Sequence, residues 1–379
     1  MSQRLRRLLI KLKGNLGING NVLSWIEGFL ADGCKGSLSV VESITITSLT
    51  AMWCFLCYAA IVLAFAVIAK LIEWQLRRPY VDKLNERYVL ITGCDSGFGN
   101  LLAKQLESLG VFVFAGCLTA KGAEQLDAET TERTKVLVLD VTKHEHVEAA
   151  LDEVKKTIPS DSGLWGLVNN AGISIACGLQ EWHTREDYRK VLDVNTLGMM
   201  DMTLTFLPLV RRAKGRIVNM ASTEGRFAMP SGAYAVSKFG VEAYSDSVRR
   251  EAKMFHYGIS VSIIEPGFFR TRISSKTNFT RNLDISWNRL KPEMQSEYLE
   301  EGYQRLRANV SSVLDNHTST KIHRVTDAME HALFSRWPKT RYAVGWDARL
   351  LWIPLSYFPA FIGDWVISLN GFQILKNNR

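Results

Sequence analysis

Three hydrophobic patterns follow one another along the chain, and the first is a long uncharged run. No residue from Ile44 to Ala69 is charged, and Lys70 ends the run. About 20 apolar residues that each rise about 1.5 Å can cross a hydrocarbon core of about 30 Å. Trp53 and Trp74 lie where tryptophan commonly anchors a helix at the membrane interface. We therefore predict a transmembrane helix over residues 44–70.

From Tyr88 onward, short β-branched or aromatic runs alternate with longer amphipathic stretches. The predicted strands are residues 88–92, 111–115, 135–139, 164–168, 215–220, 259–264 and 342–344. Repeated strand–helix units imply a parallel sheet with helices on both faces. We predict an α/β fold with a doubly wound parallel sheet (a Rossmann fold) as the catalytic domain, over residues 84–345.

The rest of the chain breaks this alternation. Residues 268–320 are polar and weakly periodic, which predicts an insertion over the carboxyl edge of the sheet, and residues 325–334 resume a helix. Residues 346–379 are rich in apolar side chains, but Pro354 and Pro359 interrupt them. We expect a C-terminal membrane-associated segment that re-enters the membrane or lies on its surface.

Charge is concentrated at the start of the chain. The sequence has 46 Lys+Arg and 38 Asp+Glu, a formal charge of +8, and the first acidic residue is Glu27. Residues 1–43 form a basic extension that fits a mitochondrial transit peptide, an amphipathic surface helix or a cytosolic flank. Basic residues lie on both sides of the span, so its orientation stays open. No Lys/Arg stripe marks the remainder, and we expect no nucleic-acid partner.

The six cysteines are scattered, and Cys54 and Cys57 lie in the apolar run. Their spacing predicts neither a disulfide framework nor a metal site.

A glycine-rich turn, Thr92–Gly99, follows the first predicted strand directly. Glycine lets the backbone approach a pyrophosphate, and the N–H groups and dipole of the next helix hold its charge. Glycine is also common in tight turns that bind nothing. The pattern indicates a phosphate-binding turn only because it directly follows a predicted strand. The predicted cofactor contacts in this turn are Gly93, Asp95, Ser96, Gly97, Phe98 and Gly99.

Polar residues also follow the third and fourth predicted strands. Asp140 comes after the third, and Asn169-Asn-Ala-Gly172 comes after the fourth. Ligands of open α/β sheets bind at such carboxyl ends, although Asp and Asn alone could merely cap the next helix. The predicted cofactor contacts here are Asp140, Asn169, Ala171 and Gly172.

Ser222, Tyr234 and Lys238 are the candidate catalytic residues. Ser222 follows the fifth strand, and Tyr234 and Lys238 share one face of the next helix. A neighbouring ammonium and an oxidised nicotinamide favour the phenolate, and lowering a tyrosine pKa by about 2–3 units needs roughly 3–4 kcal/mol. Ser222 can donate to the substrate oxygen. Asn195, in the middle of a predicted helix, is either a satisfied amide or the holder of a water that links Lys238 to solvent.

In this order, these motifs resemble the short-chain dehydrogenase/reductase family. The resemblance runs from about Tyr88 to the C-terminus and includes the Pro266-Gly267 turn. It implies a catalytic tetrad of Asn195, Ser222, Tyr234 and Lys238. It also implies that Lys238 contacts the nicotinamide ribose, and that Thr271, after the Pro-Gly turn, touches the cofactor.

Within the family, residues 91–99, 118–126, 164–174 and 345–351 resemble the membrane-bound retinol and hydroxysteroid dehydrogenases. Residues 114–118 and 211–216 are also similar to the related mitochondrial D-3-hydroxybutyrate dehydrogenase. The basic extension departs from the first group, whose anchors usually start near the first residue.

We therefore expect a membrane-bound oxidoreductase that transfers a hydride between NAD(H) and a lipophilic alcohol or ketone, such as a hydroxysteroid or retinol. Phe227, Met229, Phe268 and Phe269 are candidates for an apolar pocket. The alternative is a mitochondrial 3-hydroxybutyrate-type enzyme, with Arg226 or Arg270 binding the carboxylate. An intact tetrad argues against a non-catalytic cofactor-binding or tethering protein.

The cofactor, partners and compartment complete these expectations. Neither an acidic nor a basic residue lies at the end of the second strand near Cys117, while the turn offers Asp95 and Ser96, so NAD is predicted over NADP.

The expected partners are a lipophilic small molecule and membrane lipid, with a homo-oligomer left open. The endoplasmic-reticulum membrane is expected and the mitochondrial membrane is the alternative. For a cytosol-facing domain, no glycan is expected on Asn278, Asn309 or Asn316.

Overall fold

The computed structural model describes residue 53, residues 55–175 and residues 177–369. It divides into two units, residues 1–76 and residues 77–379, and each is described by itself. The helix Phe55–Arg77, which lies in the first unit up to Leu76, contains an 18-residue stretch with a mean hydropathy of 2.5 and is long and apolar enough to cross a membrane. It runs past residue 70, where the predicted span ends. The basic extension 1–43 and the first part of the predicted span lie outside the described residues.

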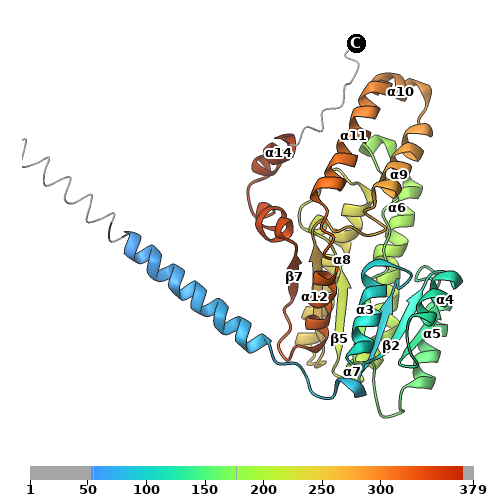
Figure 1. The fold of residues 1–379 in the computed structure, drawn as a ribbon, viewed down its shortest axis with the longest axis vertical. Helices are drawn as coiled ribbons and strands as arrows, with labels where there is room; N and C mark the ends of the chain where they lie inside the picture. The colour runs from blue at the N-terminus through green and yellow to red at the C-terminus, as the bar shows by residue number, and fades with distance from the viewer. Residues whose placement is uncertain (1–52, 54, 176, 370–379) are drawn as a thin grey trace, which may run out of the picture. The chain divides into compact units, whose positions relative to one another are not determined.

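A seven-stranded parallel sheet forms the centre of the second unit, as predicted (Figure 1). Its order is β3-β2-β1-β4-β5-β6-β7. The chain order reverses between β1 and β4, and ligands of doubly wound sheets bind at such a switch point. The strands are β1 (Tyr88–Thr92), β2 (Phe112–Cys117), β3 (Thr134–Val138), β4 (Gly166–Asn169), β5 (Arg216–Met220), β6 (Ser260–Pro266) and β7 (Arg341–Val344).

Alternating side chains fill a core on each face of the sheet. In β1, Val89 and Ile91 belong to one buried cluster and Leu90 to the other. One face is covered by α3 (Gly97–Ser108), α4 (Ala120–Ala128) and α12 (His323–Phe334). The other is covered by α5 (His144–Thr157), α7 (Met199–Arg212) and α8 (Ala233–Met254). Strands buried on both faces read as continuous apolar runs, which is why the sequence predicts them to within about two residues.

One long helical path leads into α7. The helix α6 (Arg185–Leu192) continues through a π-helical stretch, η3 (Asp193–Gly198), before α7 begins. π-Helical turns inserted in α-helices are often found at functional sites.

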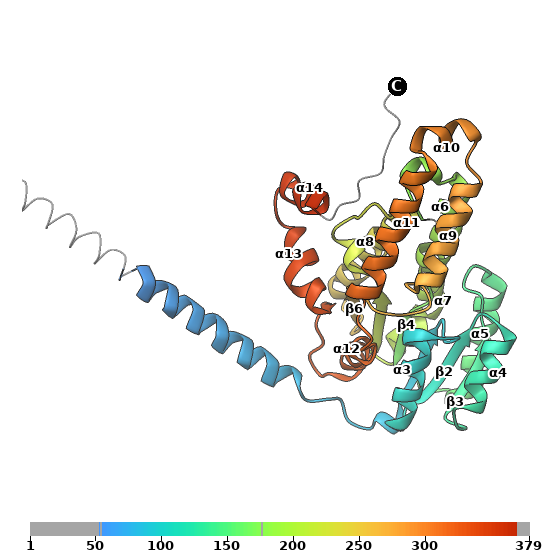
Figure 2. The ribbon, with the colours of Figure 1, turned by 45° about the horizontal axis from the view of Figure 1, so that its top comes forward.

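The segment between β6 and α12 is helical, which its weak periodicity does not predict. It forms α9 (Lys276–Asn288), α10 (Pro292–Tyr298) and α11 (Glu300–His317), grouped together in both ribbon views (Figure 2). Trp287 stacks on Tyr303 at 4.7 Å and meets Trp182, from the loop after β4, at 5.3 Å. These helices bury a few aromatic side chains against a loop that is distant in the sequence. Each helix therefore has only a short apolar stripe, and its sequence shows weak helical periodicity.

The C-terminal segment presents two faces. It comprises η5 (Ala348–Trp352), α13 (Ile353–Leu355) and α14 (Ala360–Leu369). Pro359 lies in the break before α14, whereas Pro354 lies within the continuous helical stretch formed by η5 and α13. Trp352 stacks on Phe227 with ring centroids 5.8 Å apart and meets the edge of Phe268 at 6.4 Å. Other large apolar side chains point to solvent: Leu350, Tyr357, Phe358, Phe361, Trp365 and Leu369.

Candidate active site

The glycine-rich turn between β1 and α3 is shaped by close backbone approach. Gly93 and Gly97 have φ of +72° and +69°, a region that favours glycine. A β-carbon on Gly99 would lie 2.5 Å from the Gly93 carbonyl oxygen. Outside its own turn and helix, a β-carbon on Gly97 would meet only the Thr271 Cβ, at 3.9 Å, among the described residues. The turn is therefore tight on one side and open on the other.

The open side is suited to an anion. Ser96 is the N-cap of the 12-residue α3, but its side chain makes no capping hydrogen bond. The first N–H groups of α3 are thus left without a side-chain acceptor, next to a glycine that leaves room for a ligand. These features fit the pyrophosphate of a dinucleotide, and Thr271 lies beside the same opening.

Asp95 braces the turn against the end of β2. Its carboxylate accepts hydrogen bonds from the Leu118 N–H at 2.7 Å and from the Thr119 N–H and hydroxyl at 3.0 and 2.7 Å. The sequence shows no acid at the end of β2, but the fold brings this one there. A negative charge therefore stands where dinucleotide-binding sheets select between ribose hydroxyls and a 2′-phosphate.

The Asn-Asn-Ala-Gly run joins β4 to the turn. The Asn170 amide donates to the carbonyls of Thr92 and Gly93 at 2.9 and 3.1 Å, and the Thr92 hydroxyl accepts from the Ala171 N–H at 3.0 Å. The Asn169 amide instead donates to Thr203 and Asn219, at 2.9 and 2.8 Å.

Asn169 and Asn170 thus have different tasks. The Asn169 side chain holds β4, β5 and α7 together, and its contact with a cofactor stays a prediction. Asn170, absent from the predicted contacts, supports the glycine turn. The sequence signal that could have identified Asn170 is its position directly after a buried strand.

Asp140 caps the turn that follows β3. Its carboxylate accepts from the Thr142 N–H at 3.0 Å and from the Thr142 hydroxyl at 2.7 Å. Asp140 therefore stabilises this turn and does not cap the next helix, whose N-cap residue is Lys143. Contact of Asp140 with a cofactor stays a prediction.

Tyr234 and Lys238 lie in the first turns of α8, and Ser222 lies at the end of β5. Lys238 is buried, and its ammonium donates to the Met220 carbonyl at 2.7 Å and lies 5.6 Å from the centre of the Tyr234 ring. The Ser222 hydroxyl accepts from the Glu224 N–H at 3.2 Å and also bonds to the Tyr234 hydroxyl. The predicted trio is thus assembled on two adjacent elements.

The protonation of this trio differs from the sequence-based expectation. Burial, with a contribution from the Glu224 carboxylate, raises the pKa of Tyr234 above its usual value, and the Ser222 hydrogen bond opposes this. Burial also lowers the pKa of Lys238 to about 8, and the charge of Glu242 counteracts it. The chain alone therefore keeps Tyr234 protonated at neutral pH. The predicted lowering of its pKa relies on Lys238 and an oxidised nicotinamide together, and for the chain alone the direction is the opposite.

Asn195 lies in the π-helical stretch η3. Its amide oxygen accepts from the Ile173 N–H at 2.8 Å, and its nitrogen donates to the Ile173 carbonyl at 3.0 Å and to the Ser237 hydroxyl at 2.9 Å. A β-carbon on Gly172 would lie 3.3 Å from the Asn195 Oδ1 and 3.8 Å from the Lys238 Nζ. Asn195 is therefore a satisfied amide next to Lys238. The wider i→i+5 turn brings it there.

The Pro266-Gly267 turn is held by Asp347, a residue that we did not single out from the sequence. The Asp347 carboxylate accepts from the Phe268 N–H at 2.8 Å, and a β-carbon on Gly267 would lie 2.1 Å from its Oδ2. The Gly345-Trp-Asp347 motif, noted only as part of the resemblance, thus braces the loop that carries Thr271.

Several candidate pocket residues are engaged elsewhere. Arg226 bonds to the Glu265 carboxylate at 3.0 Å and to the Tyr357 hydroxyl. Arg270 is exposed and donates to the Asp315 carbonyl at 3.4 Å. Phe269 is buried against Phe98, so it belongs to the core and not to a pocket.

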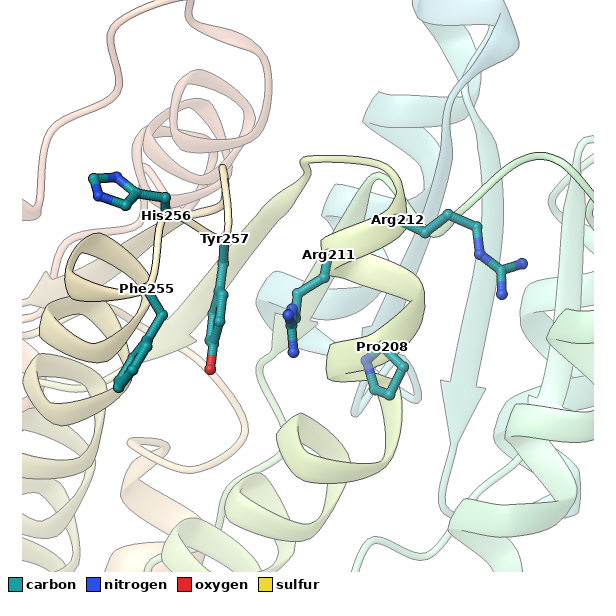
Figure 3. A pocket seen from close by; sticks show the side chains of 6 residues that line it. All are labelled: Pro208, Arg211, Arg212, Phe255, His256 and Tyr257. Carbon is teal, nitrogen blue, oxygen red and sulfur yellow. The ribbon is translucent and has the colours of Figure 1, made fainter.

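One surface cavity lies far from these residues. It has a volume of about 420 Å³ and is lined by Pro208, Arg211, Arg212, Phe255, His256 and Tyr257 (Figure 3). The Arg211 guanidinium stacks 3.8 Å from the centre of the Tyr257 ring. The cavity adjoins the start of β5, opposite the carboxyl ends of the strands, and is not part of the candidate active site.

Comparison with known proteins agrees with this geometry. Residues 87–282 match the short chain dehydrogenase family. Retinol dehydrogenase 16 of Homo sapiens is 45% identical over 83% of this chain and 96% of that protein. The 17-beta-hydroxysteroid dehydrogenase type 6 of Homo sapiens is 46% identical over 84% and 97%, respectively.

A solved short-chain dehydrogenase from Streptomyces avermitilis superposes with a TM-score of 0.57 at 24% identity, over 76% of this chain and 99% of that one. At that identity the likeness supports the fold alone. With the glycine turn, the tetrad and these relatives in place, the chain belongs to the short-chain dehydrogenase family, nicotinamide-dependent oxidoreductases that act on alcohols and ketones.

Proposed function

We propose that this protein is a membrane-bound dehydrogenase that interconverts a lipophilic alcohol and its carbonyl compound, such as a hydroxysteroid or retinol, with NAD(H). The observation that carries the proposal is the assembly of Asn195, Ser222, Tyr234 and Lys238 beside an uncapped glycine turn. The substrate class is supported by the names of the two human relatives and by the apolar C-terminal segment. In the 3-hydroxybutyrate alternative an arginine must bind a carboxylate, but Arg226 is already paired with Glu265.

Each residue has a separable part in the reaction. A bound nicotinamide accepts or donates the hydride. The Ser222 hydroxyl donates to the substrate oxygen, and the Tyr234 hydroxyl gives or takes the proton at that oxygen. Lys238 places a positive charge near the tyrosine ring, and Asn195 positions the backbone of Ile173 and the Ser237 hydroxyl around it.

The cofactor preference is proposed from Asp95. Its carboxylate at the end of β2 is suited to ribose hydroxyls, and its charge opposes a 2′-phosphate. Lys121, in the first turn of α4, is the nearby cation that could compensate.

We further propose that substrate reaches the site from the bilayer along the C-terminal segment. Phe227, at the inner face of this segment, lies five residues after Ser222 and stacks on Trp352. On the outer face, Phe361 and Trp365 are 71% and 61% exposed. Exposed aromatic and aliphatic side chains of this kind insert into the interface between headgroups and acyl chains.

The endoplasmic-reticulum membrane, with a cytosol-facing catalytic unit, is the proposed location. Cys94, Cys117 and Cys177 are buried free thiols, as is common in reducing compartments. The three sequons lie in helices α9 and α11, whereas glycosylated sequons are typically in surface loops.

Tyr234→Phe is expected to remove most turnover, by about 10²–10⁴-fold, while the fold and cofactor binding stay nearly intact, because only the phenol oxygen carries the proton. The measurement is a panel of retinol, hydroxysteroids and 3-hydroxybutyrate assayed on membranes, with cofactor binding followed separately. More than about a tenth of the wild-type rate in this variant would contradict the assignment. Selective turnover of 3-hydroxybutyrate would contradict the substrate class.

A preference for NAD over NADP of at least about tenfold in kcat/KM is expected, equivalent to roughly 1.4 kcal/mol. Asp95→Asn should reduce that preference by removing the charge while keeping an acceptor for the Thr119 N–H. Steady-state kinetics with both cofactors measure it, and Glu132→Gln, an exposed carboxylate before β3, is the matched control. Equal or better use of NADP by the wild-type protein would overturn the proposal.

Replacing Phe361 and Trp365 together by serine is expected to raise KM for a lipophilic substrate about fivefold and leave kcat and the KM for NAD unchanged, because membrane contact is weakened and the site is not. A short water-soluble alcohol should show no change. Leu204→Ser, at an exposed position on α7, is the control. An unchanged KM for the lipophilic substrate would show that the segment does not serve its access.

Glycosidase treatment of the native protein is expected to cause no mobility shift, because a cytosol-facing unit never meets the glycosylation machinery. A shift would place the catalytic unit in the lumen. Import into isolated mitochondria, with loss of about 35 N-terminal residues, would favour a transit peptide instead.

A further inference from the structure

Glu224 is an acidic residue inside the candidate active site that the tetrad does not use. It lies in the short helix η4 (Thr223–Gly225), two residues after Ser222. Its backbone N–H donates to the Ser222 hydroxyl at 3.2 Å, and its side chain is half-buried. No lysine or arginine among the described residues pairs with it.

Two hydrogen bonds tie the Glu224 carboxylate to the start of α8. The Ser231 hydroxyl donates to the carboxylate, and the Ser231 carbonyl accepts from the Tyr234 N–H at 3.3 Å. The loop from Ser222 to Ser231 is thus closed at both ends beside Tyr234. Arg226, the nearest cation in sequence, instead donates to Glu265 on β6.

The groups that face these residues come from three elements. Around Tyr234 stand Lys238 on its own helix and Ser222 and Glu224 from the end of β5. Glu224 faces Ser231 and Tyr234, and its charge also reaches the buried Cys177 thiol in the loop after β4. Ser231 therefore holds the Glu224 carboxylate at the start of α8, in the loop that joins Ser222 to Tyr234.

We propose that Glu224, whose carboxylate Ser231 holds at the start of α8, is a positioning residue that acts on the reaction through Tyr234 by opposing a negative charge on its oxygen. A negative charge in a dry site disfavours a second negative charge nearby, so the phenolate forms only at higher pH. Lys238 and an oxidised nicotinamide act in the opposite sense. The proposal rests on the proposed function and adds a residue to the control of its proton-transfer step.

The charge of Glu224 is itself sensitive to pH. Burial raises its pKa to about 7, and the Ser231 hydrogen bond partly opposes this. Its effect on Tyr234 is therefore present above about pH 7 and fades below it. The consequence applies to both directions, because alcohol oxidation needs the phenolate and carbonyl reduction needs the phenol.

Glu224→Gln keeps the size and the acceptor for Ser231 but removes the charge. We expect its pH profiles of kcat/KM for oxidation and for reduction both to move toward lower pH by up to about one unit. The gain in oxidation, up to about tenfold, should appear only above about pH 7, where Glu224 is ionised in the wild-type protein. Glu224→Asp, which restores the charge, should return the profiles toward those of the wild-type protein, and Glu132→Gln should not move them. Unmoved profiles in Glu224→Gln, or a uniform loss of activity at every pH, would overturn the proposal.

A second measurement does not depend on turnover. The tyrosinate absorbance of the full-length, NAD-bound protein is titrated with and without Tyr234→Phe, and the difference reports Tyr234 alone. In the Glu224→Gln background this difference should appear about one unit lower in pH. If the titration moves but no alcohol is oxidised, the substrate proposal fails and the role of Glu224 stands; an unmoved titration refutes that role.

Discussion

The arrangement of the candidate site depends on the Asn170 amide, which bridges β1 and β4 where the strand order reverses. Its two hydrogen bonds to the carbonyls of Thr92 and Gly93 hold the glycine turn against the end of β4. Gly99 lets α3 begin close to the same carbonyl. Because these groups are locked together, the first N–H groups of α3 stay directed at the switch point without a side chain to cap them.

Relative to this fixed point, the candidate catalytic residues are positioned by the strands and helices that carry them. β5 ends next to β4, so its last residues bring Ser222 and the Met220 carbonyl to the same edge. That carbonyl accepts from Lys238 and thereby fixes α8, on which Tyr234 lies one turn earlier. The π-helical turn before α7 delivers Asn195 to the same place. Hydrogen bonds of buried groups are costly to leave unmade, so this network specifies one arrangement.

The environment of this network is balanced between opposite charges. Burial and the Glu224 carboxylate favour the phenol of Tyr234, while the Lys238 ammonium lies 5.6 Å from the centre of its ring. A positive charge nearby, from Lys238 or from a bound oxidised nicotinamide, would favour the tyrosinate. Such opposition keeps the tyrosine within reach of both protonation states, as a reversible dehydrogenase requires. The C-terminal segment covers Phe227 on one face and exposes aromatic side chains on the other.

The sequence alone predicted the parallel sheet, an apolar helix long enough to span a membrane, and the trio Ser222, Tyr234 and Lys238. These follow from local signals: continuous apolar strands, an uncharged run, and residues one helical turn apart. The role of Asn195 is implied only by the family resemblance. Tertiary structure decided the rest. Asp95 stands at the end of β2, Asp347 braces the Pro-Gly turn, and Asn169 serves the sheet. The helices α9–α11 have a core only through Trp182 in a distant loop. Each of these features depends on contacts between segments that are far apart in the chain. Local sequence patterns do not predict which side chains are buried or which charges meet at such contacts.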